Sequence, residues 1–452
     1  MEQEPKSARV TAQRPKQAEE AKAEARARRA CYLHADPAIW TDRMLEALEK
    51  GVKGGVWFSL IDKVARMTTL MRAFELVKAN DGAAGVDKVS IERYEKSADR
   101  YLSELLRELT EGNYKPLPVK RVYIPKGDGK MRPLGIPAVR DRVAQAAVRM
   151  AIEPIFEEGF SDRSFGFRPG LGCKDALREV DRLLRSGYHF VVDADLKSYF
   201  DTIPHERLMT LVKEKIADSR ILRLIELFLT QGIMEDMQVR ASETGTPQGG
   251  VISPLLANVY LDPLDKLMES RGRQMIRYAD DFVIMCQTKE EAESALNEVR
   301  SWVTEVGLTL HPEKTRIVNA RANGFDFLGY RFERRHKRPR KKSLEKLKDT
   351  IRAKTPRTSG QSTSDIIANL NTTLRGWYEY FKHCSRNTFV VLDAMVRRRL
   401  RAILMKRHGR KGIPNGNCHR IWPTAYFEGL GLFSLLETYH RELALHQRQR
   451  RH

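Results

Sequence analysis

The stretch Arg277-Tyr278-Ala279-Asp280-Asp281-Phe282-Val283-Ile284-Met285 sets two adjacent acids among apolar residues that favour β-strands. It predicts two strands over Met275–Cys286 around a tight turn at Ala279-Asp280, which leaves both carboxylates at the tip of the hairpin. Adjacent negative charges repel, and burial increases that repulsion, so the pair is tolerated either in water or beside a divalent cation. Taken alone, an Asp-Asp pair in a hairpin turn is more often turn chemistry than a functional site.

A second acidic stretch, His189-Phe190-Val191-Val192-Asp193-Ala194-Asp195, ends a predicted strand over Tyr188–Asp195. Because residues two apart in a strand point the same way, Asp193 and Asp195 leave one face at the end of that strand. If this strand lies beside the Asp280 hairpin, three or four carboxylates converge. Such hard oxygen ligands suit Mg²⁺, and two such ions can clamp the attacking and leaving oxygens of a phosphoryl transfer. The alternative is a strand end whose aspartates only cap it or form a turn.

The net charge of +21 is unevenly distributed along the chain. Residues 321–452 hold 30 Lys and Arg against 10 Asp and Glu, so the first 320 residues are close to neutral. A basic region of this kind is typical of a polyanion binder, because each phosphate that it neutralises releases condensed counterions. The alternative is a solvated basic surface that aids solubility.

Composition also limits the location and the class of the protein. No stretch of about 18 consecutive apolar residues is present, so we expect no membrane span and no membrane partner. The segment Met1–Ala30 is charged and polar without an apolar signal core, so the cytosol is the expected location. The cysteines are widely spaced and form no Cys-x-x-Cys pair, which argues against a disulfide framework and a zinc ribbon.

Hydrophobic spacing and turn residues predict the remaining elements. A hairpin over 121–136 turns at Asp128-Gly129, a final strand covers 325–332, and residues 333–362 are basic. Helices are expected over 57–76, 91–111, 141–156, 205–215, 221–229, 253–269, 289–306, 366–381 and 389–407. Helices that alternate with hairpins until about residue 332, followed by helices alone, indicate an α+β fold.

Several blocks of the sequence resemble those of reverse transcriptases, in the same order. Tyr278-Ala279-Asp280-Asp281 resembles their Y-x-D-D box, and Asp195–Asp201 resembles their first catalytic block. Gly245–Asn258 resembles their P-Q-G…S-P block, and its residues are those typical of the group II intron branch. Three further stretches match other blocks of the family: Arg168–Gly170, Gly307–Lys314 and Phe327–Tyr330. The similarity covers roughly residues 60–335.

The resemblance implies that Asp195, Asp280 and Asp281 are the catalytic residues and hold two Mg²⁺ ions. Asp195 is preferred over Asp193 because the essential acid of the family's first block directly precedes a Leu-Lys pair. These three aspartates are the predicted metal ligands.

The resemblance also assigns the binding of the deoxynucleoside triphosphate (dNTP). Phe200 would lie under the sugar and exclude a ribose 2′-hydroxyl, although a core Phe is the alternative. Lys126 and Arg132 would bind the triphosphate, Lys126 through its compact ammonium charge and Arg132 through its planar guanidinium group. The alternative is that the basic hairpin is a solvated surface. Gln248 would pack on the nucleotide and the template.

The region from about 345 to 445 resembles the thumb and maturase (RNA-splicing) domain of the same family, most clearly at Leu370–Phe381. A helix over Phe389–Arg407 would present a basic face that can follow an RNA backbone, and a solvated helix is the alternative. The predicted RNA-binding residues are Arg397, Arg398, Arg401, Lys406 and Arg407.

The fold class is therefore expected to be α+β: a right-hand polymerase, whose fingers and palm contain antiparallel sheet, followed by an α-helical thumb/maturase domain. The expected boundaries are 1–55 for a basic and polar N-terminal extension, disordered by its composition, and 56–335 for fingers and palm. A basic linker over 336–364, the helical thumb/maturase region over 365–445 and a basic tail over 446–452 complete the chain.

The expected function is RNA-directed DNA polymerisation by a protein encoded within a group II intron, in a bacterial-type, nucleic-acid-associated cytosolic setting. The protein would bind the intron RNA, assist its splicing and copy it into DNA during retrohoming. Its partners would be group II intron RNA, an RNA template with a DNA primer, target DNA and dNTPs. Because no segment with paired cysteines follows the maturase-like region up to His452, no endonuclease activity is expected.

Three competing functions remain open on the sequence. A splicing factor with an inactive polymerase would not need the three aspartates, and dNTP incorporation distinguishes it. For a retron-type or defence-associated reverse transcriptase, the flanking DNA would lack an intron. A metal-dependent nuclease would not need the Lys126 hairpin or the Gln248 block.

Overall fold

The computed structural model describes residues 35–449, apart from residues 53, 128–129, 237, 241–243, 334–335, 411, 413 and 415. The predictions for residues 1–34 of the N-terminal extension and 450–452 of the tail lie outside the described residues. The chain divides into two compact units. The first takes in the chain up to Val180, Ala194–Met285 and Glu293–Arg316, and the second takes in Asp181–Asp193, Cys286–Ala292 and Ile317–His452.

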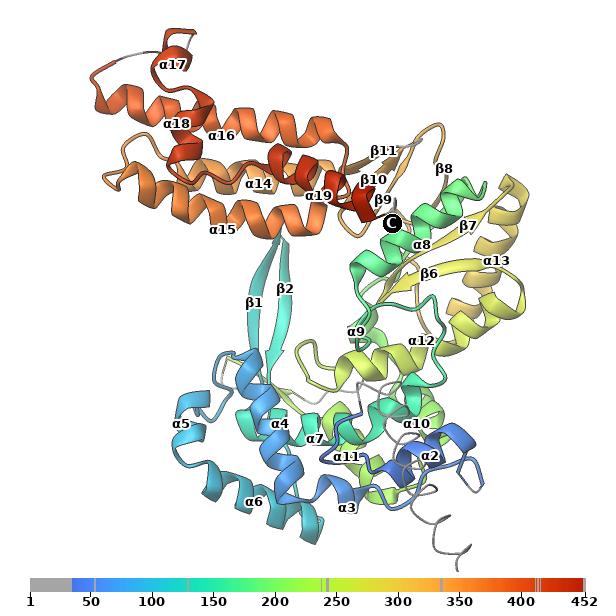
Figure 1. The fold of residues 1–452 in the computed structure, drawn as a ribbon. Helices are drawn as coiled ribbons and strands as arrows, with labels where there is room; N and C mark the ends of the chain where they lie inside the picture. Colours follow the sequence, from blue (N-terminus) through green and yellow to red (C-terminus); the bar gives the residue numbers. More distant parts are fainter. Residues whose placement is uncertain are drawn as a thin grey trace, which may run out of the picture. The chain divides into compact units, whose positions relative to one another are not determined.

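A long hairpin, β1 (Val119–Gly127) and β2 (Lys130–Ile136), confirms the hairpin predicted over 121–136 (Figure 1). The register shifts between Pro125 and Gly127, which marks a β-bulge near the tip. Strand β1 also pairs in parallel with β4 (Ile233–Glu235), which pairs with β5 (Gln238–Arg240). The sheet therefore has the order β2-β1-β4-β5.

Two of the helices predicted near the N-terminus are each divided in the structure. The stretch 57–76 gives a short α3 (Ile61–Val64) and then α4 (Met67–Asn80), because Arg66 adopts an extended conformation between them. The stretch 91–111 gives α5 (Ile91–Lys96) and α6 (Ala98–Glu111), because Ser97 leaves the helical region of backbone conformation. Buried apolar residues on α4 and α6 pack on the almost entirely buried α7 (Val139–Glu157), which continues beyond Pro154.

The central sheet has the strand order β6-β7-β3-β8. Strands β6 (Gln274–Tyr278) and β7 (Asp281–Cys286) confirm the predicted pair around Ala279-Asp280. Strand β3 (Phe190–Asp195) is the neighbour of β7, and β8 (Arg316–Asn319) follows β3. Helix α12 (Ser253–Ser270), whose first turn contains Pro254, packs on β6. Two acidic segments that lie far apart in the sequence thus belong to adjacent strands.

Three further helices follow the positions predicted over 205–215, 221–229 and 289–306: α10 (His205–Lys213), α11 (Ser219–Leu229) and α13 (Lys289–Glu305). Three others were not predicted: α2 (Asp42–Lys50), α8 (Cys173–Arg185) and α9 (Tyr199–Thr202). Helix α2 corrects the disorder expected for that part of the N-terminal extension, because it buries Leu45 and Leu48.

The prediction of one strand over 325–332 is wrong, because the chain reverses inside it. Strands β9 (Phe325–Phe327) and β10 (Tyr330–Glu333) are antiparallel, and the turn between them has positive φ at Leu328 (45°) and Gly329 (79°). With β11 (His336–Pro339) they form a sheet of order β11-β10-β9.

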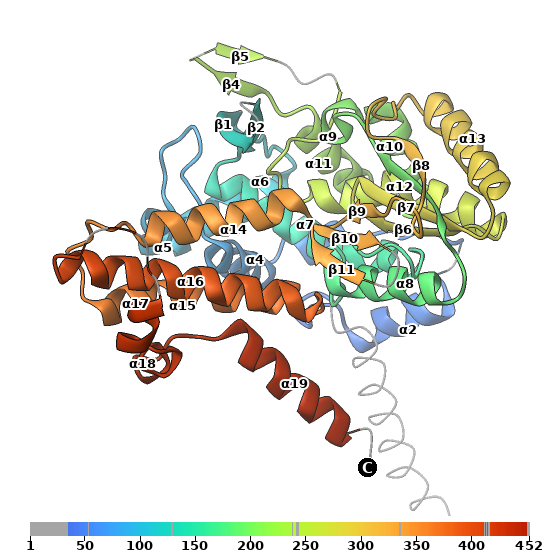
Figure 2. The same cartoon turned by 90° about the horizontal axis from the view of Figure 1, so that it is seen from above.

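The basic stretch expected as a linker over 336–364 contains regular structure instead: β11 and helix α14 (Lys341–Lys354). Buried Leu347 and Ile351 give α14 an apolar stripe against α15 (Thr363–Phe381), which outweighs the charge of its other faces. Helices α14, α15 and α16 (Arg386–Arg407) lie side by side, and α19 (Leu435–Gln449) packs on α16 (Figures 1 and 2). Two short helices, α17 (Gly416–Ile421) and α18 (Thr424–Gly429), connect them.

The sheets and helices of the first 333 residues and the helical region that follows β11 confirm the α+β fold class. Among the described residues, no helix has both the length and the apolar character needed to cross a bilayer.

Candidate active site

The turn between β6 and β7 carries the two adjacent aspartates. Tyr278 and Asp281 are paired across the hairpin, so Ala279 and Asp280 form the reversal. Ala279 is buried and has a φ of 59°, in a region that residues other than glycine seldom adopt. Asp280 and Asp281 are partly exposed beside it. The sequence prediction of two carboxylates at a hairpin tip is therefore confirmed.

Asp195 is the last residue of β3, the strand adjacent to β7. Its carboxylate, 23% exposed, forms an ion pair with the ammonium group of Lys314, which is 53% exposed. The backbone carbonyl of Asp195 accepts a hydrogen bond from His311 N at 2.7 Å. The Gly307–Lys314 block thus lies along the end of β3. Sequence reasoning quoted Lys314 within that block but gave it no role.

An aromatic side chain connects the two acidic segments. The ring of Phe167 lies 6.2 Å from that of Phe200, which follows β3, and 6.5 Å from that of Tyr278, at the end of β6. Burial raises the pKa of the Tyr199 hydroxyl well above its usual value; the charge of Arg277 opposes that rise, and Tyr260 and Asp280 add to it. Phe167 was missed from the sequence, although it directly precedes the Arg168–Gly170 block.

The fit of the carboxylates to a metal ion depends on their arrangement and on the chemistry of their oxygen donors. Among the described residues, no group of three or more His, Cys, Asp or Glu is arranged as a set of metal ligands. The chemistry of the donors nevertheless fits a divalent cation, because the Lys314 ammonium lies against Asp195 where a cation is expected. Asp280 and Asp281 share a turn and Asp195 ends the neighbouring strand, while joint metal ligation by the three stays a prediction.

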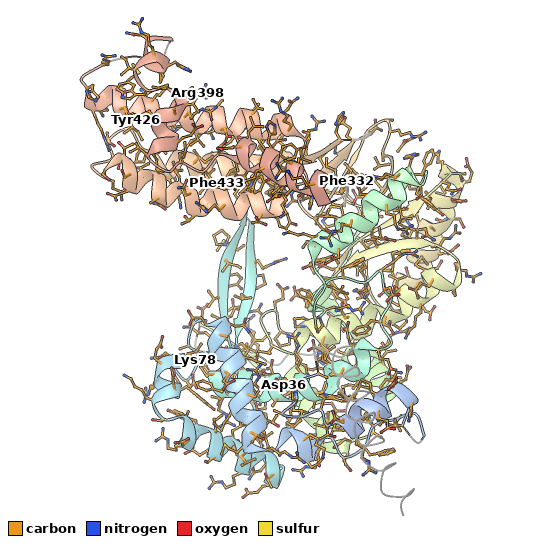
Figure 3. The ribbon with its side chains drawn as sticks, viewed as in Figure 1. Asp36, Lys78, Phe332, Arg398, Tyr426 and Phe433 are labelled. Carbon is orange, nitrogen blue, oxygen red and sulfur yellow. The ribbon has the colours of Figure 1, made fainter. Side chains whose placement is uncertain are left out.

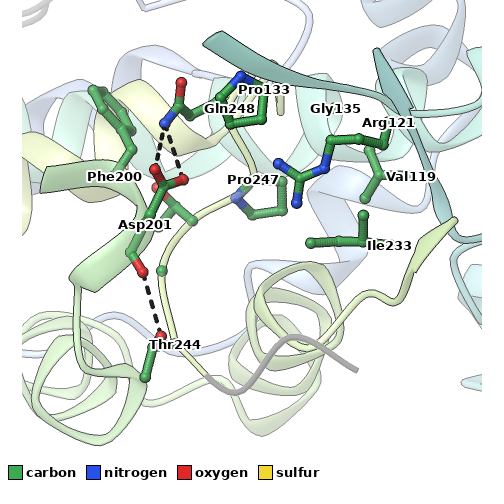
Figure 4. Close-up of a pocket in the computed structure, with 12 residues that line it drawn as sticks. Val119, Arg121, Pro133, Gly135, Phe200, Asp201, Ile233, Thr244, Pro247 and Gln248 are labelled. Carbon is green, nitrogen blue, oxygen red and sulfur yellow. Dashed lines mark hydrogen bonds between the residues drawn. The ribbon is translucent and has the colours of Figure 1, made fainter. Parts of the chain in front are cut away.

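Phe200 and Gln248 line one pocket with a volume of about 280 Å³ (Figure 4). The Gln248 side-chain amide donates to both carboxylate oxygens of Asp201, each at 2.9 Å, and Thr244 Oγ1 donates to the Asp201 carbonyl at 3.3 Å. Gly135 N, on β2, donates to Gln248 O at 2.6 Å and ties the hairpin to this loop. Asp201 was quoted in the first catalytic block, but its bond to Gln248 could not be read from the sequence.

The two basic residues predicted on the hairpin are less well defined. Arg132 is exposed opposite Ile124 and does not line the pocket, whereas its neighbour Pro133 does. Lys126 belongs to β1, but its side chain lies outside the described residues. Arg121, which was not predicted, extends its guanidinium group toward Pro247 (Figure 4), and its buried Nε has no hydrogen-bond partner among the residues that the structure describes.

The basic residues predicted on α16 fall into two groups. Arg398 and Lys406 are exposed, and Arg397 is half-buried (Figure 3 labels Arg398). Arg401 must be removed from the predicted RNA-binding face, because it is 3% exposed, donates to Trp422 O at 2.9 Å and stacks over Phe427. Its alkyl stem and planar head fill the interior of the helical region instead.

Arg407 is exposed, but its guanidinium group is largely engaged within the chain. It donates to Thr363 Oγ1 at 3.0 Å and to the carbonyl oxygens of Ser359 and Gln361. These bonds join the end of α16 to the loop before α15. Of the five predicted residues, Arg398 and Lys406 therefore offer the most accessible charge.

Comparison with known proteins identifies two regions. Residues 124–332 match the family model for reverse transcriptase (RNA-dependent DNA polymerase), and residues 344–422 match that for the group II intron maturase-specific domain.

Individual relatives agree with these models. Protein YkfC of Escherichia coli (strain K12) is 36% identical over 62% of this chain and 84% of its own length. Group II intron-encoded protein LtrA of Lactococcus lactis subsp. cremoris is 43% identical over 38% of this chain, a match that spans only 28% of LtrA. A chain of a partial Cas6-RT-Cas1–Cas2 complex is 26% identical over 55% of this chain and 42% of its own, with a TM-score of 0.36.

The polymerase family model covers both acidic segments and most of the pocket, and the maturase family model covers α15, α16 and most of α14. Residues 124–332 are thus an RNA-directed DNA polymerase domain with a maturase-specific domain after it. The chain belongs to the group II intron-encoded reverse transcriptase/maturase family.

Proposed function

We propose that this protein copies group II intron RNA into DNA and assists splicing of that RNA. The observation that carries the polymerase proposal is the relation of the two acidic segments. Asp195 ends β3, the Asp280-Asp281 turn begins the adjacent β7, and the Phe167 ring contacts an aromatic residue from each segment. Carboxylates that two adjacent strands bring together would suit nucleotidyl transfer.

Asp195, Asp280 and Asp281 would hold two Mg²⁺ ions. Bound divalent cations would supply the charge that activates a primer 3′-hydroxyl and stabilises the departing pyrophosphate. Lys314 would keep the Asp195 carboxylate neutralised until then, because its ammonium group forms an ion pair with that carboxylate. The rest of the site would position groups and neutralise charge.

Selection of the nucleotide would fall to the pocket around Phe200. Its ring lies 5.5 Å from that of Tyr199 and 6.2 Å from that of Phe167, and these contacts would limit its movement away from an added hydroxyl. Gln248, oriented by Asp201, would pack on the incoming nucleotide and the template. Arg132, with Lys126 on the same hairpin, would bind the triphosphate of the dNTP.

The C-terminal region would bind the intron RNA, with Arg398 and Lys406 contacting phosphates and Arg397 and Arg407 contributing at the edges. This binding would support splicing and bring the polymerase to its template. Copying of the intron into target DNA during retrohoming is the further step that we propose.

Primer extension on an RNA template tests the polymerase proposal. Asp280→Asn should reduce dNTP incorporation by at least about 1,000-fold, since it removes several kcal/mol of transition-state stabilisation. Asp236→Asn changes another aspartate in a hairpin turn, between β4 and β5, and should retain activity. Incorporation by Asp280→Asn near the wild-type rate would refute the proposal. A wild-type chain that binds intron RNA without incorporating dNTPs would support the inactive splicing factor.

The role of Phe200 is tested by discrimination between dNTPs and ribonucleotides. Phe200→Ala should lower the ratio of their kcat/KM values by at least about tenfold, because the side chain that clashes with the 2′-hydroxyl is gone. An unchanged ratio would remove the steric role.

RNA binding is tested by its salt dependence. The Arg398→Ala/Lys406→Ala double variant should weaken intron binding and reduce the salt slope by about two, since two phosphate contacts are lost. Lys382→Ala is the matched control, because Glu379 and Glu442 already neutralise Lys382. If the double variant and the control bind equally, α16 is not the RNA-binding surface.

A further inference from the structure

The turn that carries Asp280 is held by a side chain from its own hairpin. Arg277 Nη1 donates to the backbone carbonyl of Ala279 at 3.1 Å. That carbonyl and the Asp280 N–H belong to one planar peptide unit. Fixing the carbonyl therefore fixes the peptide plane from which the Asp280 side chain departs.

Arg277 is itself held rigidly inside the protein, with 1% of its surface exposed. Its Nε donates to the Asp265 carboxylate oxygens at 2.8 and 3.0 Å, and its Nη2 donates to the same carboxylate. Its Nη1 also donates to Asn258 Oδ1 at 3.0 Å. Asn258 and Asp265 are both buried on α12, two turns apart and so on one face.

The same network reaches the other side of the turn. Asn258 Nδ2 donates to Gly166 O at 2.8 Å, and Phe165 N donates to Arg277 O at 2.9 Å. Gly166 lies so close that an added Cβ would collide with Ala279 N. The left-handed Ala279 is thus enclosed by backbone on one side and held by a guanidinium group on the other.

Stability alone does not account for this arrangement. A buried ion pair is costly to desolvate, and well-packed apolar residues often serve equally well or better. Only a planar fork with several donors can bind Asp265, Asn258 and the Ala279 carbonyl together. Arg277 Nη1, which the ion pair with Asp265 does not use, instead donates to the turn that carries Asp280 and Asp281.

We infer that Arg277, oriented by Asp265 and Asn258, is a positioning residue that fixes the direction in which Asp280 presents its carboxylate. This inference rests on the proposed polymerase function. The network does not touch substrate; it acts through the Ala279–Asp280 peptide.

The test separates positioning from stability with the Arg277→Met/Asp265→Val double variant. It removes both buried charges and replaces them with apolar side chains, so the melting temperature should stay close to that of the wild type. The Ala279 carbonyl loses its donor. We expect kcat for primer extension to fall about 10- to 100-fold, as a misplaced catalytic group implies, with a smaller change in KM for dNTP.

A second readout does not depend on turnover. Binding of Mn²⁺ to the full chain on an RNA template and DNA primer, followed by electron paramagnetic resonance, should weaken about tenfold or more in the double variant. Asp280→Asn, which removes one predicted metal ligand, gives the reference loss of Mn²⁺ affinity. A double variant with a normal melting temperature, normal kcat and normal Mn²⁺ affinity would overturn the inference. If the wild type itself does not extend primers, the proposed function fails instead.

Should the double variant fail to fold, Asn258→Ala decides the question. It leaves the ion pair intact and removes only the link between Arg277 and Gly166. A cooperative melt with kcat reduced about tenfold would support the inference, and a cooperative melt with unchanged kcat would reject it.

Discussion

The β6–β7 turn and the β9–β10 turn each reverse the chain through a residue other than glycine with positive φ, 59° at Ala279 and 45° at Leu328. In both, the carbonyl of that residue accepts a side-chain hydrogen bond, from Arg277 at 3.1 Å and from Tyr380 Oη at 2.8 Å. The β9–β10 turn continues with a glycine and uses a neutral hydroxyl. The β6–β7 turn continues with two aspartates and uses a buried ion pair. We call Arg277 with Asp265 the charged brace and Tyr380 the neutral brace. The charged brace supports the turn that carries the carboxylates.

The largest expected effect comes from breaking the charged brace on one side only. Arg277→Met leaves Asp265 buried without its partner and should reduce the free energy of unfolding by about 3–5 kcal/mol. Chemical denaturation measures this change. A loss below about 1 kcal/mol would mean that water reaches Asp265 and that the pair is not buried.

The backbone contact behind the Ala279-Asp280 turn should have the next largest effect. Gly166→Ala forces the Ala279 backbone away and should cost about 1–3 kcal/mol of stability while lowering kcat. Gly329→Ala is the matched change in the other turn. Its Cβ meets only ordinary contacts, so it should cost about 1 kcal/mol through its φ of 79° and leave kcat unchanged. Equal kcat values for the two variants would argue against a special role for the first turn.

Removing the neutral brace should cost less than removing the charged one. Tyr380→Phe deletes one hydrogen bond to Leu328 O and should reduce stability by about 1 kcal/mol. The Mg²⁺ dependence of primer extension should not change. A shifted Mg²⁺ dependence would show that the contacts supporting either turn affect the carboxylates predicted to be catalytic.

The smallest effect on stability is expected for the exposed ion pair at Asp195. Lys314→Gln should change stability by less than about 1 kcal/mol, because both partners meet solvent. Mn²⁺ binding should tighten by up to about fivefold, since the competing ammonium group is gone. Weaker Mn²⁺ binding in this variant would mean that Lys314 helps to hold the site together.

Local patterns in the sequence predicted the hairpin at Ala279-Asp280 and the strand that ends at Asp195. Alternating β-formers and turn residues act over a few residues, so they are visible in the chain itself. The resemblance to reverse transcriptases implied Phe200 and Gln248, and the structure places both at one pocket.

Tertiary partners could not be predicted in the same way. The bonds of Arg277 to Asp265 and of Gln248 to Asp201 depend on how distant elements pack. Arg401 looked like part of a basic face, but the fold buries it against Trp422 and Phe427. The stretch 336–364 looked like a linker because its charge conceals the two apolar residues that α14 buries.

The most direct measurement is anomalous X-ray scattering at the manganese edge from crystals of the chain with an RNA template, a DNA primer and a dNTP. We expect Mn²⁺ to be bound by carboxylate oxygens of Asp195 and of the Asp280-Asp281 turn together. Manganese bound by only one of these segments, or away from both, would contradict it.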